Sequence, residues 1–343
     1  MTEEYSQLIN KFNELYTKGI VYRMDQFKKS KNVTTFWIIF LTIFCIMVVS
    51  YFLIMIFFEI CNPPYEIDKI VLTSLFCICF GLSVLNFANA MKKGFEEKIK
   101  NYVMPEIASC FGDLTYYNSK SVISKDDFDN SLLMPVCTIE NIDDVFVGKY
   151  NDVEFKIQEC ECWRGIARHQ GLYLFDGVIV EFSMNKPFKG HTIIRPKNLL
   201  KDKQDFWSKF TSVDEFFYTF IHGKQKDIDC SFETLKYTRM EDINFENTSD
   251  TFTNDEVEAR YLLTTAFIKR FDEIKLAFDV NNVSCSFYNN KMFLMLHTKK
   301  DLFSLGSLIK PIEDKKQFYL LFDEILSIIK LIDYFKLNQK IGL

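Results

Sequence analysis

Two uncharged apolar runs constrain this chain more than any other feature. Phe36–Phe58 contains 23 residues and Ile70–Met91 contains 22, and neither run has an Asp, Glu, Lys, Arg or His. At about 1.5 Å per residue, each run forms a helix long enough to cross a hydrocarbon layer of ~30 Å. A helix also satisfies its own backbone hydrogen bonds in lipid. The sequence therefore predicts a two-helix transmembrane hairpin over residues 34–91, with a short outside loop at residues 59–69.

Basic residues near the two runs predict the orientation of this hairpin. Four precede the first run and four follow the second, whereas the loop between the runs has one lysine and three carboxylates. Positively charged flanks stay in the cytoplasm, so both termini are expected there and the loop is expected outside. The eight residues are Arg23, Lys28, Lys29, Lys31, Lys92, Lys93, Lys98 and Lys100.

Residues 1–33 have apolar positions at helical spacing and predict an amphipathic helix. It could lie on the membrane surface. The alternative that we favour is packing against an apolar stripe after the second span, formed by Phe95, Ile99, Tyr102 and Val103. Pro105 is expected to end that stripe's helix. In the hairpin, Ser74, Gly81 and Ala88 share one helix face and allow close approach to the first span.

Residues 92–343 are long enough to form a domain with its own core. Asn151-Asp152 and Asn289-Asn290 each separate two apolar, β-branched stretches, which is typical of hairpins. Gly171–Met184 reads as a long central strand. Shorter strands are expected at His191–Arg195, Phe232–Tyr237 and Ile243–Phe245, and helices at Asp202–Ile221 and Phe318–Phe335. This mixture indicates an α+β fold with a mixed, mainly antiparallel sheet and packing helices.

A further helix start is expected at Thr253. Thr253 and Glu256 have the spacing of a capping box, and Phe252 and Val257 that of a hydrophobic staple. The helix is expected to continue to about Phe278.

The composition and the absence of known motifs argue against several functional classes of protein. The net charge of −5 argues against a nucleic-acid binder. The ten cysteines include no C-x-x-C pair, which favours buried reduced thiols. The motifs of phosphate loops, dinucleotide sites, zinc proteases and serine hydrolases are absent, so no catalytic residue and no cofactor is predicted. Cys160-Glu161-Cys162 with His169 and His191 could supply metal ligands, but we favour two buried core thiols and predict no metal site.

Two stretches are candidate contacts for a ligand or partner. The loop Asn185–Gly190 could hold an anionic ligand or a lipid headgroup through Asn185, Lys186, Lys189, Gly190 and backbone N–H groups, or it could be a plain turn.

The second stretch contains Glu258, Arg260 and Tyr261. Asp255 and Glu258 could bind a metal or transfer protons. Alternatively, the segment is a capped helix on which Glu256 and Arg260 form an i,i+4 pair. An internal salt bridge or a contact with Phe175–Thr192 then explains the residues Glu258–Tyr261.

Three stretches resemble a bacterial membrane-protein family known as domain of unknown function 3137. They are Phe175–Pro196 (FDGVIVEFSMNKPFKGHTIIRP), Asp255–Thr264 (DEVEARYLLT) and Lys336–Ile341 (KLNQKI). Two membrane spans followed by this domain are also the family's layout. The family's biochemical activity is not established, so the resemblance implies an architecture and leaves the function open. Relatives are often encoded near LemA-type membrane proteins, which implies such a protein as a partner.

These observations predict an integral inner-membrane protein whose cytoplasmic domain binds a protein partner or small ligand at the membrane. We expect the protein to contact the lipid bilayer, and we expect copies of the chain to form a homo-oligomer. One alternative is a membrane-anchored enzyme that uses carboxylates near Asp143, Asp144 or Glu258. The other is an oligomeric channel, although neither span carries an acidic or basic residue.

Overall fold

The computed structural model describes residues 3–61, 67–134, 137–164, 172–184, 187–197, 234–280, 282–298, 302–305, 314–335 and 337. The chain divides into two compact units. The helical unit comprises Met1–Cys110 and Ser304–Tyr319, and the sheet unit comprises Phe111–Phe303 and Leu320–Leu343.

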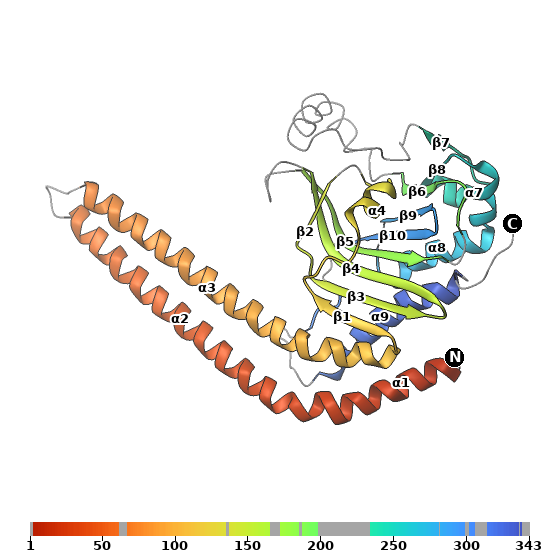
Figure 1. Ribbon diagram of the computed structural model, residues 1–343. Helices are drawn as coiled ribbons and strands as arrows, with labels where there is room; N and C mark the ends of the chain where they lie inside the picture. Colours follow the sequence, from red (N-terminus) through yellow and green to blue (C-terminus); the bar gives the residue numbers. More distant parts are fainter. Residues whose placement is uncertain are drawn as a thin grey trace. The chain divides into compact units, whose positions relative to one another are not determined.

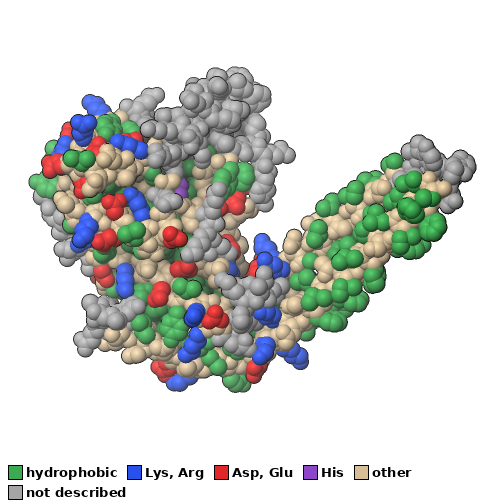
Figure 2. Space-filling view, turned by 180° about the vertical axis from the view of Figure 1, so that it is seen from behind, with side chains coloured by type: hydrophobic (Ala, Val, Ile, Leu, Met, Phe, Trp, Pro, Cys, Tyr) green, Lys and Arg blue, Asp and Glu red, His purple; other side chains and the backbone are tan. Residues whose placement is uncertain are grey.

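The helical unit is built on two long helices, α2 (Val21–Cys61) and α3 (Ile67–Ala108), which contain the two apolar runs (Figure 1). Hydrophobic side chains cover both of them in the space-filling view (Figure 2). Ser74, Gly81 and Ala88 are half-buried while their neighbours Leu75, Leu82 and Leu85 are exposed, as expected for a face turned toward α2. The predicted pair of long apolar helices is confirmed.

The N-terminal amphipathic helix packs on the end of α3, as expected. α1 (Glu3–Leu15) continues through a π-helical turn, η1 (Tyr16–Ile20), directly into α2. The ring of Phe27 lies 5.5 Å from that of Tyr102, and the Arg23 guanidinium lies 4.3 Å from the same Tyr102 ring. Apolar side chains of both segments are buried, including Phe12, Tyr16, Ile20, Met24, Phe95, Ile99 and Val103.

The expectation that Pro105 ends this helix is wrong. α3 continues through Pro105 to Ala108, and a short 3₁₀ turn, η2 (Ser109–Phe111), follows. A proline removes one helical hydrogen bond. Burial of Met104, Ile107 and Ala108 on either side of Pro105 compensates for that loss.

In the sheet unit, ten described strands form one sheet in which every pair is antiparallel. The order is β1-β3-β4-β5-β10-β9-β6-β8-β7, and β2 also pairs with β4. The strands are β1 (Leu114–Asn118), β2 (Thr138–Glu140), β3 (Asp144–Tyr150), β4 (Val153–Arg164), β5 (Leu172–Ser183), β6 (Thr192–Pro196), β7 (Lys236–Tyr237), β8 (Ser249–Thr253), β9 (Asn282–Tyr288) and β10 (Lys291–His297).

Helices cover both faces of this sheet (Figure 1). On one face, α4 (Lys125–Asn130) contributes Phe128 to a core cluster with Phe175, Ile179 and Phe293. On the other face, α8 (Thr265–Ala277) places Phe267 5.7 Å from Phe287 of β9, between ring centroids. α9 (Lys315–Tyr334) leads to Phe335, whose ring stacks on that of Phe267.

The predicted α+β fold is confirmed, including both hairpins. Asn151, Asp152 and Asn289 have positive φ, as the tight turns of twisted hairpins require. Gly171–Met184 corresponds to β5, which is central because it pairs with both β4 and β10. The closing helix corresponds to α9. The helix expected at Asp202–Ile221 lies outside the described residues, as does the first part of Phe232–Tyr237.

Two local predictions are wrong. Ile243–Phe245 does not form a strand; it begins helix α6 (Ile243–Thr248), because the Asp242 carboxylate accepts hydrogen bonds from Asn244 N and Phe245 N.

Thr253 is not a helix cap. It ends β8, and its hydroxyl bonds that of Thr192 in β6. Asp255 instead caps α7 (Glu256–Leu262) by accepting from Glu258 N at 2.9 Å. The expected single helix is also interrupted at Leu263, where Thr264 caps α8 separately by accepting from Phe267 N at 3.2 Å.

Candidate functional site

The predicted contact between Glu258 and the Phe175–Thr192 segment is confirmed. Oε1 of Glu258 accepts from Lys189 N at 3.0 Å, and Oε2 accepts from Gly190 N at 2.6 Å. Glu258 is only 3% exposed. A buried carboxylate that accepts two backbone N–H groups forms strong, charge-assisted hydrogen bonds. Glu258 therefore joins α7 to the loop before β6.

Gly190 makes this contact sterically possible. A Cβ atom at position 190 would lie 2.6 Å from Cβ of Asp255 and 3.2 Å from Oε2 of Glu258. Such distances are shorter than van der Waals contact, so a side chain would push α7 away from the loop.

The same geometry bears on the anion-binding hypothesis for this loop. The N–H groups of Lys189 and Gly190 already bond the Glu258 carboxylate. The Lys189 side chain is exposed. Asn185 and Lys186 lie outside the described residues. A ligand-contact role for the loop stays a prediction, and it would use side chains rather than these two amides.

Arg260 and Tyr261 lie on the outer side of α7. Arg260 pairs with Glu256 at 2.7 Å, as the i,i+4 spacing predicts, and also donates to the carbonyl of Arg239 at 3.3 Å. Tyr261 is 65% exposed. The helical period thus separates the candidate residues, because Glu258 faces the sheet while Arg260 and Tyr261 face solvent.

Asp144, another carboxylate singled out from the sequence, is fully buried at the start of β3, and the neighbouring Asp143 is half-buried. Its Oδ1 accepts a hydrogen bond from the hydroxyl of Tyr116 at 2.8 Å. Burial and the neighbouring Asp144 raise the pKa of Tyr116 well above its ordinary value. Tyr116 therefore remains a hydrogen-bond donor, and the pair joins β1 to β3.

Among the described residues, the proposed metal ligands Cys160, Cys162 and His191 are not brought together. Cys160 and Cys162 lie in the core cluster with Cys137. Contacts with Cys137 and Cys160, together with burial, raise the pKa of the Cys162 thiol well above its ordinary value. Within the described part of the chain, no three His, Cys, Asp or Glu residues are arranged to hold a metal ion. His169 lies outside that part.

His191 is fully buried and bonded elsewhere in the sheet unit. Its Nε2 lies 3.1 Å from the carbonyl of Ser131 and 2.9 Å from Oγ of Ser286. Burial lowers the pKa of His191 to about 4, so the imidazole is neutral at physiological pH.

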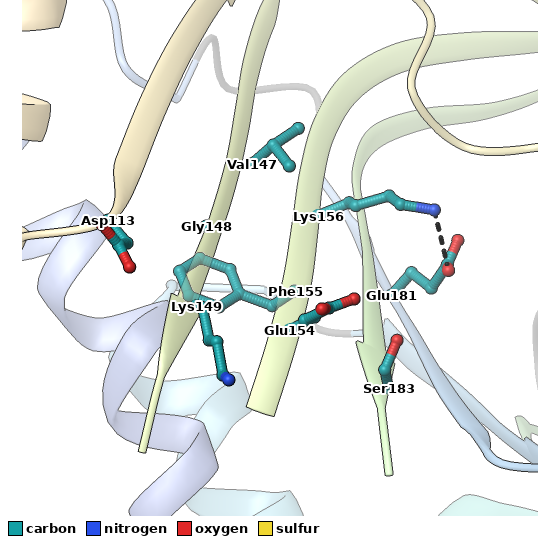
Figure 3. Close-up of a pocket in the computed structure, with 9 residues that line it drawn as sticks. All are labelled: Asp113, Val147, Gly148, Lys149, Glu154, Phe155, Lys156, Glu181 and Ser183. Carbon is teal, nitrogen blue, oxygen red and sulfur yellow. Dashed lines mark hydrogen bonds and ion pairs between the residues drawn. The ribbon is translucent and has the colours of Figure 1, made fainter. Parts of the chain in front are cut away.

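Sequence reasoning missed a cavity of about 270 Å³ at the end of strands β3, β4 and β5 (Figure 3). Five of its nine lining residues are charged, and Figure 3 shows Lys156 and Glu181 pointing toward each other on one side of it. The lining residues are Asp113, Val147, Gly148, Lys149, Glu154, Phe155, Lys156, Glu181 and Ser183.

Glu181 is the centre of an ion-pair network at this cavity. It is 2% exposed, and its Oε1 lies 3.0 Å from Nζ of Lys156 and 3.2 Å from Nζ of Lys291. Lys291 also pairs with Asp127 of α4. Burial lowers the pKa of Lys291, but the two carboxylates outweigh burial and raise it above its ordinary value. The network places four charges beside an otherwise apolar core.

A signal for this site is visible in the sequence. Glu181 is the one acidic residue within the apolar stretch Val178–Phe182 of a strand predicted to be central. A carboxylate there requires charged partners, because an unpaired buried charge is costly. Only the strand register shows that Lys156, directly opposite Glu181, is one of them.

Comparison with known proteins identifies part of the chain. Residues 173–337 match the family described as "Protein of unknown function (DUF3137)". This part of the chain is therefore similar to the DUF3137 family. The resemblance expected from the three sequence motifs is thereby confirmed. The matched residues include Glu181, Gly190 and Glu258, whereas the cavity residues from Asp113 to Lys156 precede them.

No curated protein matches the chain. Among solved structures, the chain is similar to the crystal structure of the mycobacterial trehalose monomycolate transport factor A, TtfA, with 8% sequence identity and a TM-score of 0.30. The alignment covers 68% of this chain and 93% of that one. At so low a TM-score, the similarity carries no argument about function.

Proposed function

We propose that this chain is an inner-membrane protein with two spans that holds its DUF3137-like domain on the cytoplasmic side, where the domain binds a protein partner or a small ligand. The observation that carries the proposal is the exposure of apolar side chains along α2 and α3. In each helix, the most apolar 18-residue window has no buried residue.

Water is an unsuitable environment for these helices. A helix of a soluble domain buries its apolar stripe, and monomers rarely expose apolar patches larger than a few hundred Å². Here large side chains are exposed over about seven turns of α2 and about five turns of α3, as at Ile46, Phe57 and Leu72. Lipid would cover them at no such cost.

The exposed lysines support the orientation. Lys28 and Lys29 precede the apolar part of α2, and Lys92 and Lys93 follow that of α3. All four are exposed and lie at the same end of the hairpin, since the two helices run in opposite directions. Their retention on the cytoplasmic side would place the sheet unit there as well.

A natural cysteine provides a direct test of this topology. Cys61 is exposed at the end of α2, beside the loop expected to face outward. We expect a membrane-impermeant maleimide to label Cys61 in right-side-out membrane vesicles, and Cys61→Ser to lose that label. A cysteine introduced at the exposed position Leu276 of α8, in a Cys61→Ser background, should react only in inside-out vesicles. The reverse pattern would overturn the proposal.

The partner-binding part of the proposal rests on the outer side of α7. Tyr261 and Val257 are both exposed apolar side chains one helical turn apart, beside the charged Arg260. A photo-crosslinking residue at Tyr261 should capture one dominant protein in cells, and Lys189→Glu should reduce that product if the loop contributes. Mass spectrometry would identify a LemA-type partner, and a product of twice the chain's mass would indicate a homo-oligomer.

No specific observation among the described residues favours the enzyme or the channel alternative. Glu258 and Asp144 each hold a hydrogen bond within the sheet unit. If Tyr261 yields no crosslinked protein, the small-ligand form of the proposal remains to be tested at the cavity.

A further inference from the structure

We propose that the cavity beside Glu181 binds a small organic amine in its protonated, monocationic form. This inference rests on the proposed function, because it specifies the class of small ligand that the cytoplasmic domain takes. It is carried by the placement of the lining residues, the unpaired oxygen of Glu181, and the charge balance of the cavity.

The strand register explains why these residues meet. Val147 is opposite Lys156, and Lys149 is opposite Glu154, across β3 and β4. Lys156 is opposite Glu181 across β4 and β5. Because side chains alternate along a strand, these residues share one face of the sheet, together with Ser183. Their polar groups are therefore directed to one side, as Figure 3 shows for Lys156 and Glu181.

Glu181 lacks one hydrogen bond. Its Oε1 is bonded to two lysines, but its buried Oε2 has no partner among the described residues. An unsatisfied buried acceptor costs about 1–3 kcal/mol, and more when it is charged. Glu181 lines the cavity, so a donor that reaches Oε2 from the cavity would remove this cost.

The charge of the lining favours a cationic donor. Three carboxylates and two lysines line the cavity, which leaves one negative charge in excess. Lys149 is in addition paired with Asp152, outside the lining, at 3.1 Å. An ammonium group would offset the excess charge and donate to Oε2 of Glu181.

The remaining lining limits the ligand's size. Val147 offers an apolar contact for a short hydrocarbon chain on the same face of the sheet. A cavity of about 270 Å³ lies just below the range of about 300–1,000 Å³ typical of ligand sites, so the ligand must be small. The competing occupant is water, which can also donate to Oε2 but does not prefer an acidic lining.

The test compares two probes of nearly equal shape, propylammonium and 1-propanol. Both are titrated against the purified full-length protein in detergent micelles, with binding followed by saturation-transfer NMR. We expect propylammonium to bind at least roughly threefold more tightly, since one net unit charge at about 4–5 Å is worth of order 1 kcal/mol in an exposed site. Equal binding of the two probes, or binding of neither, would assign the cavity to water and overturn the proposal.

Variants connect the binding to the cavity. Glu154 is exposed, so Glu154→Gln should fold normally and weaken propylammonium binding about threefold without changing 1-propanol binding. Glu241→Gln, at a remote exposed glutamate, is the matched control and should change neither. Glu181→Gln should abolish the preference for the amine, and its near-ultraviolet circular dichroism shows whether it folds. An unchanged amine affinity in Glu154→Gln would contradict the assignment, whatever the fate of Glu181→Gln.

The two proposals can fail separately. Loss of the probe preference with the expected Cys61 labelling would remove the amine site and leave the membrane topology intact. Reversed Cys61 labelling with a clear amine preference would overturn the membrane topology and leave the amine site intact.

Discussion

The α2–α3 hairpin and the sheet unit are built from similar apolar residues placed in opposite ways. Phe57 of α2 is 65% exposed, whereas Phe271 of α8 is fully buried among Phe245, Phe267 and neighbouring side chains. Helices in the sheet unit each have a polar side that faces water. The hairpin helices have none over their apolar runs, which makes them two candidate membrane spans. Hydrophobicity alone therefore does not distinguish a core from a membrane span; the pattern of polar residues does.

The largest expected effect sharpens this contrast. Phe271→Ala should lower the free energy of unfolding of the sheet unit by about 3–5 kcal/mol, because it leaves a cavity in a packed core. Phe57→Ala should change it by less than about 0.5 kcal/mol, as for a surface position. Urea unfolding in detergent, followed by tryptophan fluorescence, measures both. Similar losses for the two variants would show that the hairpin packs against protein instead of lipid.

An isoleucine-to-lysine substitution made in both regions tests whether the surroundings of each are lipid or water. Ile78 of α3 and Ile243 of α6 are 59% and 75% exposed. Ile78→Lys should disfavour membrane insertion by about 2.5–3.5 kcal/mol, since it places a charge near the centre of a span. Ile243→Lys should be nearly neutral, because its surroundings are water. The fraction of protein left in carbonate-washed membranes gives the first result, and urea unfolding the second. Normal insertion of Ile78→Lys would break the comparison.

Two glutamates on α7 separate buried from exposed charge within the sheet unit. Glu258→Gln weakens two charge-assisted hydrogen bonds to Lys189 N and Gly190 N and should cost about 1.5–3 kcal/mol of unfolding free energy. Glu256→Gln removes an exposed pair with Arg260 and should cost about 0.2–1 kcal/mol. The control lies on the same helix two residues away. If Glu256→Gln costs as much, the contribution comes from the helix start and not from the loop contact.

The buried His191 makes the stability of the sheet unit depend on pH. The pKa is about 4 in the folded sheet unit and about 6.5 when His191 is unfolded, so the unfolded chain binds the proton first as pH falls. The stability is therefore complete above about pH 6.5 and decreases toward pH 4, by about 2 kcal/mol between pH 7 and pH 5. His191→Gln should remove this dependence. Parallel pH profiles for the two proteins would show that His191 is not desolvated.

The sequence determines those features of this protein that depend on neighbouring residues. The uncharged runs at Phe36–Phe58 and Ile70–Met91 define the two long helices, because length and composition suffice. Asn151-Asp152 defines a hairpin, because asparagine and aspartate tolerate positive φ. The i,i+4 pair of Glu256 and Arg260 follows from helical spacing alone.

Only the tertiary structure decides which residues of distant segments come into contact. Thr253 has the local pattern of a helix cap, but pairing of β8 with β6 keeps it in a strand, and Asp255 takes the role. Lys156 and Glu181 lie 25 positions apart, and their meeting depends on the register of β4 and β5. Likewise, Glu258 reaches Gly190 because packing brings α7 to the loop before β6. Local sequence specifies helices and turns through short-range sterics, whereas the sites depend on long-range pairing that no single segment encodes.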